Sequence, residues 1–233
     1  PEGRILALYS APTYNPNDFI GGISRERWTP YVDDRAKPLL DRAIQARYPP
    51  ASPFKPAIAA MALRRGIVTL HSHMPEPCTG SFFYGDRAFG CWKHTGHGDL
   101  DLTQAIAQSC DVYFYQLGLK LGLEPILTDG VLMGFRDRSG IDLMNEVRPH
   151  YPSSTEYFDR AYGSRGWSKG VTLNMAIGQG ENAQTLVNMM RFYAALAGDG
   201  TASAPYLVHP DAGVDRDLGL SPAQLLGLRR ALE

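Results

Sequence analysis

The chain has 233 residues, of which 44% are hydrophobic and 20% are charged, and its formal net charge is −1. This composition is sufficient for one domain with a real core. The near-neutral charge and the lack of a basic stripe exclude a nucleic-acid-binding protein. No apolar run reaches about eighteen residues, so the sequence predicts neither a membrane span nor a signal peptide.

The first quarter of the chain predicts one strand followed by one long helix. Residues 5–10 are mostly apolar and end at prolines, which is typical of a buried strand. Residues 21–51 are polar and interrupted by prolines. The apolar spacing over residues 52–65 favours a buried helix, with Ser52 as its N-cap and Pro53 as its first residue.

The remainder predicts mainly helices joined by loops. Glycine, aromatic, cysteine and histidine residues without a period indicate a loop over 74–100 that needs support from outside. Residues 140–170 are expected to be rich in loops, and 172–177 to be short and either extended or helical. Helices are predicted over 102–109, 110–121, 124–135, 183–196 and 222–232 (capped by Ser221), with a strand at 206–208.

The segment Ser52-Pro53-Phe54-Lys55 has the pattern S-x-x-K. Residues three apart lie on one face of a helix, so the Ser52 hydroxyl and the Lys55 amine can meet. A serine hydroxyl becomes a good nucleophile when a neighbouring group takes its proton, and a buried lysine can be that base. The same four residues also fit a capping serine beside an unrelated surface lysine.

The wider context resembles a known family. The stretch from Tyr48 to Pro56 is similar to the Y-P-P-G-S-x-x-K-P signature of class B penicillin-binding proteins, and Ser109-Cys110-Asp111 is similar to their second motif, S-x-N or S-x-D. The resemblance extends in order over nearly the whole chain. Segment 3–19 resembles a further motif of the family, and segments 96–98, 109–115, 166–180 and 198–200 resemble its elongation-type subgroup, penicillin-binding protein 2.

This resemblance implies an α/β fold of the penicillin-binding protein and serine β-lactamase kind, here a helix-rich part with an incomplete antiparallel sheet. It implies a peptidoglycan D,D-transpeptidase that acts on stem peptides through a serine acyl-enzyme and is a target of β-lactam antibiotics. It also implies a place at the periplasmic face of the bacterial inner membrane and a membrane glycosyltransferase of the elongation machinery as a partner.

By the same resemblance, each catalytic residue has an expected role. Ser52 attacks the carbonyl of the penultimate D-alanine, Lys55 accepts its proton, and Ser109 relays a proton toward the leaving group. Asp111 holds Lys55 or positions substrate. Without the family context, Ser109 and Asp111 are equally explained as N-cap residues of a helix.

The sequence departs from the family pattern at two places. Ala51 stands where glycine usually precedes the nucleophile, and the third motif, Lys-Thr-Gly or Lys-Ser-Gly, does not occur. We therefore expect residues 1–233 to be a partial transpeptidase domain without the third-motif strand, the membrane anchor and the pedestal, and to acylate slowly or not at all. Alternatives are a non-catalytic remnant that acts as a scaffold or partner-binding module, and a D,D-carboxypeptidase or β-lactamase-like hydrolase.

The three cysteines, Cys78, Cys91 and Cys110, form a candidate metal site with His97. Thiolate and imidazole are the usual ligands of tetrahedral zinc. The spacing is not that of a zinc ribbon, so buried free thiols or one disulfide with a spare thiol also fit.

Family resemblance strengthens the metal interpretation. Members of the penicillin-binding protein 2 subgroup have a metal site in this region, and their aspartates fall where Cys78 and Cys91 stand. The expectation is one structural zinc ion. His94 is the competing histidine, and His71 and His73 are more distant candidates.

Overall fold

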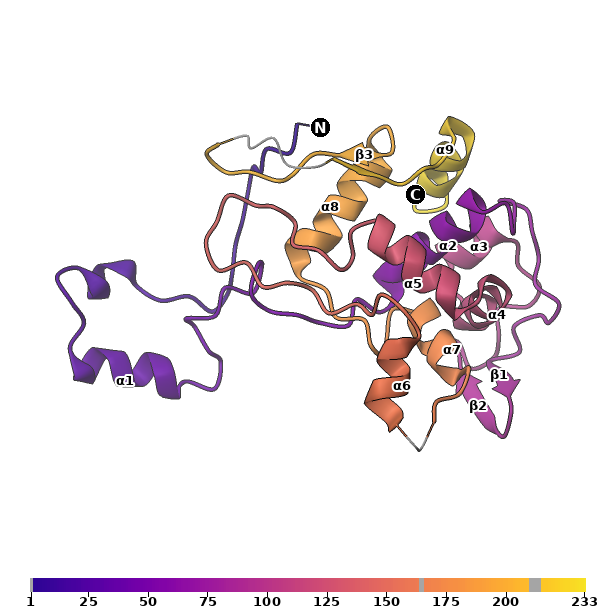
Figure 1. The fold of residues 1–233 in the computed structure, drawn as a ribbon, viewed down its shortest axis with the longest axis horizontal. Helices are drawn as coiled ribbons and strands as arrows, with labels where there is room; N and C mark the ends of the chain where they lie inside the picture. The colour runs from indigo at the N-terminus through magenta and orange to yellow at the C-terminus, as the bar shows by residue number, and fades with distance from the viewer. Residues whose placement is uncertain (1, 164–165, 210–214) are drawn as a thin grey trace.

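Helix α2 (Lys55–Arg64) lies at the centre of the body in the computed structural model, which describes residues 2–163, 166–209 and 215–233 (Figure 1). Every residue of α2 from Lys55 to Leu63 is buried. Four of its residues are alanines, which let neighbouring helices approach closely. Helices α3, α4, α5 and α9 pack around α2, so this helix forms the core on which the other elements are arranged.

The other helices follow largely from local sequence signals. An Asp101–Gln104 capping box begins α3, and a Ser221–Gln224 capping box begins α9. Gly122 separates α4 from α5 with a φ of 88°. The helical bounds are α1 (Arg25–Asp33), α3 (Leu102–Ala107), α4 (Asp111–Leu121), α5 (Leu123–Leu132), α6 (Glu156–Tyr162), α7 (Gly170–Ala176), α8 (Leu186–Ala197) and α9 (Pro222–Arg230), with short 3-10 turns η1 (Pro16–Phe19) and η2 (Ser52–Phe54).

The strands of the described residues form two small antiparallel sheets. Strand β1 (Ser81–Tyr84) pairs with β2 (Arg87–Gly90), with Phe82 opposite Phe89. Strand β3 (Thr201–Ala202) pairs with β4 (Arg216–Asp217). The helix-rich part with little sheet that was predicted from the sequence is therefore confirmed.

The two predicted strands near the ends are wrong. Residues 5–10 are extended but form no strand, and Leu6 is 89% exposed. The segment makes only a short parallel contact, in which Ile5 N–H donates to the Tyr206 carbonyl at 2.8 Å. Beyond Tyr206, the N–H groups of residues 207–209 donate to the Asp142 carboxylate instead of to a neighbouring strand.

Two other segments also depart from expectation: the predicted loop over 74–100 contains the β1–β2 hairpin, and the loop-rich stretch 140–170 contains α6. For residues 172–177, expected to be either extended or helical, the helical alternative is confirmed up to Ala176, where α7 ends. Tertiary packing orders the hairpin and α7, because α7 packs along α4 and both hairpin strands contact α4.

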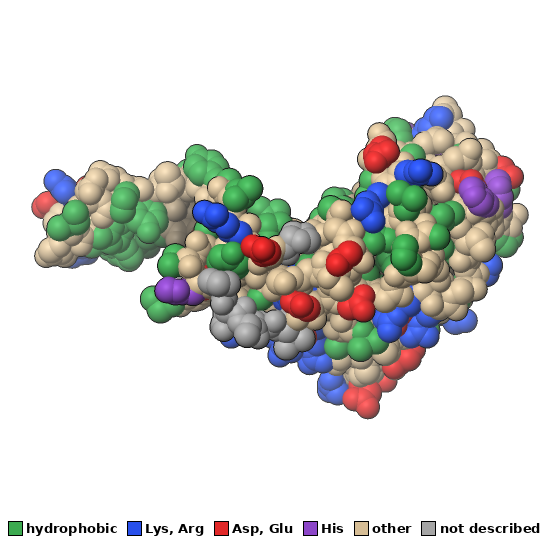
Figure 2. Space-filling view, turned by 90° about the horizontal axis from the view of Figure 1, so that it is seen from above, with side chains coloured by type: hydrophobic (Ala, Val, Ile, Leu, Met, Phe, Trp, Pro, Cys, Tyr) green, Lys and Arg blue, Asp and Glu red, His purple; other side chains and the backbone are tan. Residues whose placement is uncertain are grey.

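Residues 13–37, here called the N-terminal arm, project from the body as a narrow extension (Figures 1 and 2). Every residue of η1 and α1 is at least partly exposed. The arm is held by its own aromatic rings: Phe19 lies 5.2 Å from Tyr14 and 6.1 Å from Tyr31, centroid to centroid. It has a small cluster of rings but no buried core.

Candidate functional site

Ser52 lies in the 3-10 turn η2, immediately before the central helix α2. The N-cap of this turn is Ala51, whose φ of 52° is unusual for a residue with a side chain. The prediction of Ser52 as the N-cap is therefore wrong: the helical turn begins at Ser52, and the serine hydroxyl faces Lys55 instead of a backbone amide.

The backbone around Ala51 is held by a distant loop. Ala51 N–H donates to the carbonyl of Gly178 at 2.8 Å. A β-carbon on Gly178 would lie 2.3 Å from the Ala51 oxygen and 2.6 Å from Cβ of Phe54, so only glycine permits this approach. The hydroxyl of Tyr193 donates to the Pro53 carbonyl at 2.8 Å. The nucleophile turn is thus fixed from the α7–α8 side.

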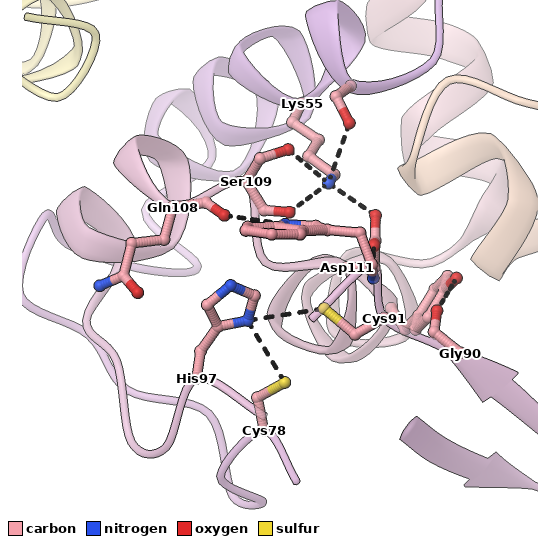
Figure 3. A network of polar contacts seen from close by, with 11 residues as sticks. Lys55, Cys78, Gly90, Cys91, His97, Gln108, Ser109 and Asp111 are labelled. Carbon is pink, nitrogen blue, oxygen red and sulfur yellow. Dashed lines mark hydrogen bonds and ion pairs between the residues drawn. The ribbon is translucent and has the colours of Figure 1, made fainter. Parts of the chain in front are cut away.

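Lys55 is only 2% exposed and is surrounded by polar partners. Its Nζ lies 3.3 Å from Oγ of Ser52 and 3.0 Å from Oγ of Ser109, and it donates to the Ser109 carbonyl at 2.8 Å. It forms an ion pair of 2.6 Å with Oδ1 of Asp111. One amine therefore joins both serines and the carboxylate that the sequence singled out (Figure 3).

The connection between α3 and α4 presents Ser109 and Asp111. Ser109 has a φ of 50°, a left-handed conformation that turns its hydroxyl and its carbonyl toward Lys55. Asp111 is the first residue of α4, and its second oxygen accepts the N–H of Trp92 at 3.1 Å. No side chain caps α4, whose N-cap is Cys110, so the capping interpretation of Ser109 and Asp111 is wrong.

The four predicted metal ligands lie together on the other side of the second motif. The ligand atoms of Cys78, Cys91, His97 and Cys110 all lie within 4.8 Å of one another. His97 Nδ1 is 3.5 Å from both the Cys78 and the Cys91 sulfur atoms, and no disulfide joins the cysteines. Figure 3 shows three of these ligands, Cys78, Cys91 and His97, beneath the segment that carries Ser109 and Asp111.

Backbone pairing brings His97 to the cysteines. Cys78 and Gly98 exchange two backbone hydrogen bonds of 2.8 and 2.9 Å. Gly96 has a φ of 80°, and a β-carbon there would lie 2.2 Å from the Cys78 carbonyl oxygen. The competing histidines lie outside the cluster: His94 is exposed, and His71 and His73 contact aspartates.

The donor set fits a tetrahedral metal ion. Bond lengths of about 2.3 Å for Zn–S and 2.0–2.1 Å for Zn–N require S···N separations of roughly 3.5 Å at tetrahedral angles. Burial raises the pKa of the Cys91 and Cys110 thiols and lowers the pKa of His97, because each charged form loses its hydration. A divalent cation would compensate the buried thiolates.

Three residues near the site were not predicted as functional. Trp92 donates its backbone N–H to Asp111 and its indole N–H to the Gln108 carbonyl at 3.1 Å, so it contacts the last residue of the second motif and the residue that precedes the motif. Gly178 and Tyr193 support the nucleophile turn. A sequence signal existed for Trp92, which directly follows Cys91, and for Gly178, which lies in a Gly-Gln-Gly segment that resembles the family.

Comparison with known proteins agrees with this geometry. The family described as the penicillin-binding protein transpeptidase domain matches residues 1–230. Peptidoglycan D,D-transpeptidase MrdA of Salmonella typhimurium is 36% identical over 207 residues, which are 89% of this chain and 33% of that protein.

Solved structures give the same result. PBP2 from Helicobacter pylori, also solved in complex with MreC, has a TM-score of 0.84 and 33% identity over 95% of this chain and 41% of that one. Pseudomonas aeruginosa PBP2 in complex with WCK 5153 has a TM-score of 0.87 and 31% identity over 97% of this chain and 53% of that one.

The chain spans about a third of the length of the curated relatives it matches. Among the described helices, none has the length and apolar character needed to cross a membrane. The match over residues 1–230, the PBP2 structures and the sequence motifs agree, and the chain belongs to the penicillin-binding protein transpeptidase family, in its PBP2 or MrdA subgroup.

Proposed function

We propose that this chain carries the acylation machinery of a peptidoglycan D,D-transpeptidase. One observation carries the proposal: the buried amine of Lys55 contacts both Ser52 and Ser109 while it pairs with Asp111. A structural lysine would need only the carboxylate. The convergence of two hydroxyl groups on the amine is what proton transfer to and from a nucleophilic serine requires.

In the proposed reaction, Ser52 Oγ attacks the carbonyl of the penultimate residue of a stem peptide. Lys55 accepts the Ser52 proton, and Ser109 passes a proton to the departing amine. The peptide C–N bond breaks, and an ester to Ser52 remains. The amine of a second stem peptide then forms a new amide bond and releases Ser52. A β-lactam would enter the same first step.

Two features of the site would support the transition state. The backbone N–H of Ser52 lies at the N-terminus of a helical turn, where it has no intrahelical acceptor, and would supply one donor to the oxyanion. Asp111, fixed by Lys55 and Trp92, would keep the amine between the two serines. Loss of one oxyanion donor typically reduces rate by about 10²–10³-fold.

The test is β-lactam acylation of the chain, followed by mass spectrometry. We expect a penicillin adduct that forms slowly, because residues 1–233 contain no third motif, on the peptide that contains Ser52. The adduct should be absent in Ser52→Ala, and its rate of formation should be reduced at least about a hundredfold by Lys55→Met. Exposed Ser153→Ala is the matched control and should label as the parent chain does.

The alternatives give different results. A hydrolase would turn penicillin over and accumulate the opened product, whereas a transpeptidase site would retain the adduct. A scaffold without catalytic function would give no adduct at long incubation. An adduct that survives Ser52→Ala would contradict the assignment of the nucleophile.

We further propose that Cys78, Cys91, His97 and Cys110 hold one structural zinc ion. The support is the convergence of four buried or half-buried donors with separations suited to tetrahedral coordination. Four protein ligands leave no open position, so the ion would supply structural support and no catalytic water. Cys110 lies between Ser109 and Asp111, so metal binding would fix the backbone of both.

Metal analysis of the purified protein tests this proposal. We expect close to one equivalent of zinc, and a loss of thermal stability on chelation or in Cys110→Ser. Less than about a tenth of an equivalent of any metal, or a Cys78–Cys91 disulfide, would contradict it.

For the whole protein, we propose stem peptides and β-lactams as ligands and the periplasmic face of the inner membrane as its location. The MreC complex of the H. pylori relative supports membership of an elongation assembly, which we propose includes a membrane glycosyltransferase. Co-purification of the whole protein with these partners is the corresponding test.

A further inference from the structure

A pocket of about 420 Å³ lies between the β1–β2 hairpin and helix α7, outside the group of catalytic residues. We call it the side pocket. Its walls carry four aromatic residues, and its rim carries one acid and one base. Its principal lining residues are Tyr84, Asp86, Arg87, Phe89, Tyr162 and Trp167.

The two chain segments that form the walls of the side pocket lead along the sequence to residues of the proposed catalytic site. The hairpin wall ends at Gly90, and two residues later the N–H of Trp92 holds Asp111. The opposite wall includes Asn174 of α7, and four residues later Gly178 accepts the N–H of Ala51, next to the nucleophile. A ligand in the side pocket would therefore lie along the two segments that position the catalytic groups.

The aromatic walls are held in fixed orientations from behind. The Trp167 indole N–H donates to Asp159 at 2.8 Å, and the Tyr162 hydroxyl donates to Glu181 at 2.5 Å. Phe89 packs edge-to-face on Tyr115 at 5.6 Å. Because the Trp167 N–H and the Tyr162 hydroxyl are hydrogen-bonded to these carboxylates, the apolar surfaces of the two rings are pre-organised for packing against a ligand.

The rim carries charges that pair with no other described side chain. The Arg87 guanidinium stands 5.3 Å from the Phe89 ring centroid and is exposed. None of the ion pairs found among the described residues involves Arg87 or Asp86. A guanidinium held over a ring presents its fork for a carboxylate, and Asp86 beside it favours a ligand that also carries a positive charge.

We propose that the side pocket binds the acceptor stem peptide, the strand whose amine attacks the acyl-enzyme. This inference rests on the proposed transpeptidase function. An acceptor carries what the pocket complements: a carboxylate for Arg87, and an aliphatic chain for the rings of Phe89 and Trp167. The amine, once deprotonated, attacks the Ser52 ester, forms the C–N bond and breaks the C–O bond, and Ser52 regains its proton.

A peptide fits the pocket better than a glycan does. Aromatic walls alone would also suit the face of a neutral sugar. A sugar without an acid group, however, offers no partner for the Arg87 guanidinium. The charged rim therefore favours the peptide part of the substrate.

The test is an NMR titration of this chain with the acceptor analogue N-acetyl-alanyl-isoglutamyl-lysine, as the free acid and with its carboxylates amidated. We expect the free acid to bind at least about tenfold more tightly, because a charge-assisted contact is worth about 1.5–3 kcal/mol. Arg87→Gln should remove this preference, and Trp167→Leu should weaken both peptides by about tenfold. The matched controls Arg160→Gln and Trp28→Leu alter exposed or arm residues and should change neither affinity.

The outcomes separate the inference from the proposed function. Peptide binding that is unchanged in Arg87→Gln and Trp167→Leu, no peptide binding at all, or competition by a neutral chito-oligosaccharide would overturn the inference. Ser52→Ala should bind the peptide normally. A chain that forms the penicillin adduct on Ser52 but does not bind the peptide refutes only the side pocket, whereas peptide binding without an adduct refutes only the acylation proposal.

Discussion

The helical core and the N-terminal arm use similar ring contacts in very different surroundings. In the core, Phe54 packs against Phe135 at 4.7 Å and is fully buried. In the arm, Phe19 meets Tyr14 at 5.2 Å, yet both rings remain partly exposed. Because stabilisation by apolar contacts scales with the area removed from water, the same geometry should contribute far more in the core.

The ion pairs of the core and the arm also differ in how far they are exposed to water. The Lys55–Asp111 pair is 2% and 15% exposed at its side chains, whereas the Arg27–Asp18 pair of the arm is 66% and 23% exposed. Water competes with the arm pair and screens it, and the core pair is shielded. Buried contacts therefore hold side chains tightly in place where the proposed chemistry lies, whereas the exposed contacts of the arm hold its side chains loosely.

The largest expected effect comes from truncating matched rings. Phe54→Ala should lower the free energy of unfolding by about 3–5 kcal/mol, because a fully buried ring is replaced by a cavity. Phe19→Ala should lower it by less than about 1 kcal/mol, since the arm buries little of this ring. Urea titrations of both variants measure the difference, and equal losses would refute it.

A smaller effect is expected from matched acids. Asp129 is buried in α5 and accepts bonds of 2.7 and 3.0 Å from Arg65 at the end of α2. Asp129→Asn should lower the free energy of unfolding by about 2 kcal/mol, because it removes a buried charge-assisted pair. Asp18→Asn in the arm should change it by less than about 1 kcal/mol. A larger loss for Asp18 would mean that the arm is coupled to the core.

Local signals predicted most of the helices, because their determinants are close together in the sequence, but α1 and α6 were missed. The Ser221–Gln224 box and the apolar spacing of α2 lie within one or two turns of the helices they define. The β1–β2 hairpin was missed because its order depends on distant contacts. Phe82 stacks on Tyr115, more than thirty residues away. The prediction of a strand over residues 5–10 was wrong for a related reason: no partner strand lies beside this segment among the described residues.

The features of the candidate site likewise fall into two groups: those that local sequence spacing reveals, and those that only the fold reveals. The Ser52–Lys55 spacing places both residues on one helix face, so the pair was visible in the sequence. The choice of His97 over His94 depends on the backbone pairing of Cys78 with Gly98, which spacing alone does not reveal. The support of Asp111 by Trp92, and that of Ala51 by Gly178, crosses between elements and required the fold.

Titration of a half-buried histidine gives a still smaller effect. Burial lowers the pKa of His150, nearby Arg47 lowers it further, and Glu181 partly opposes this. The unfolded chain, with a histidine pKa of about 6.5, then binds more protons than the folded one, so stability should fall as pH drops through about 6.5 toward the folded pKa. His150→Gln should flatten this part of the pH–stability curve. If His150→Gln left the slope of stability against pH unchanged, another group would be responsible for this pH dependence.

The smallest effect should be confined to the arm itself. The Tyr31 hydroxyl donates to Asp18 at 2.7 Å and accepts the N–H of Asn15 at 3.3 Å, so it joins η1 to α1. Tyr31→Phe keeps the ring contacts and removes both bonds. Trypsin should then cut at Arg25 and Arg27 about threefold faster, because the arm opens locally more often while the core stays folded. The midpoint of global unfolding should not move. Slower cleavage, or a lower midpoint with unchanged cleavage, would show that the arm and the core unfold as one unit.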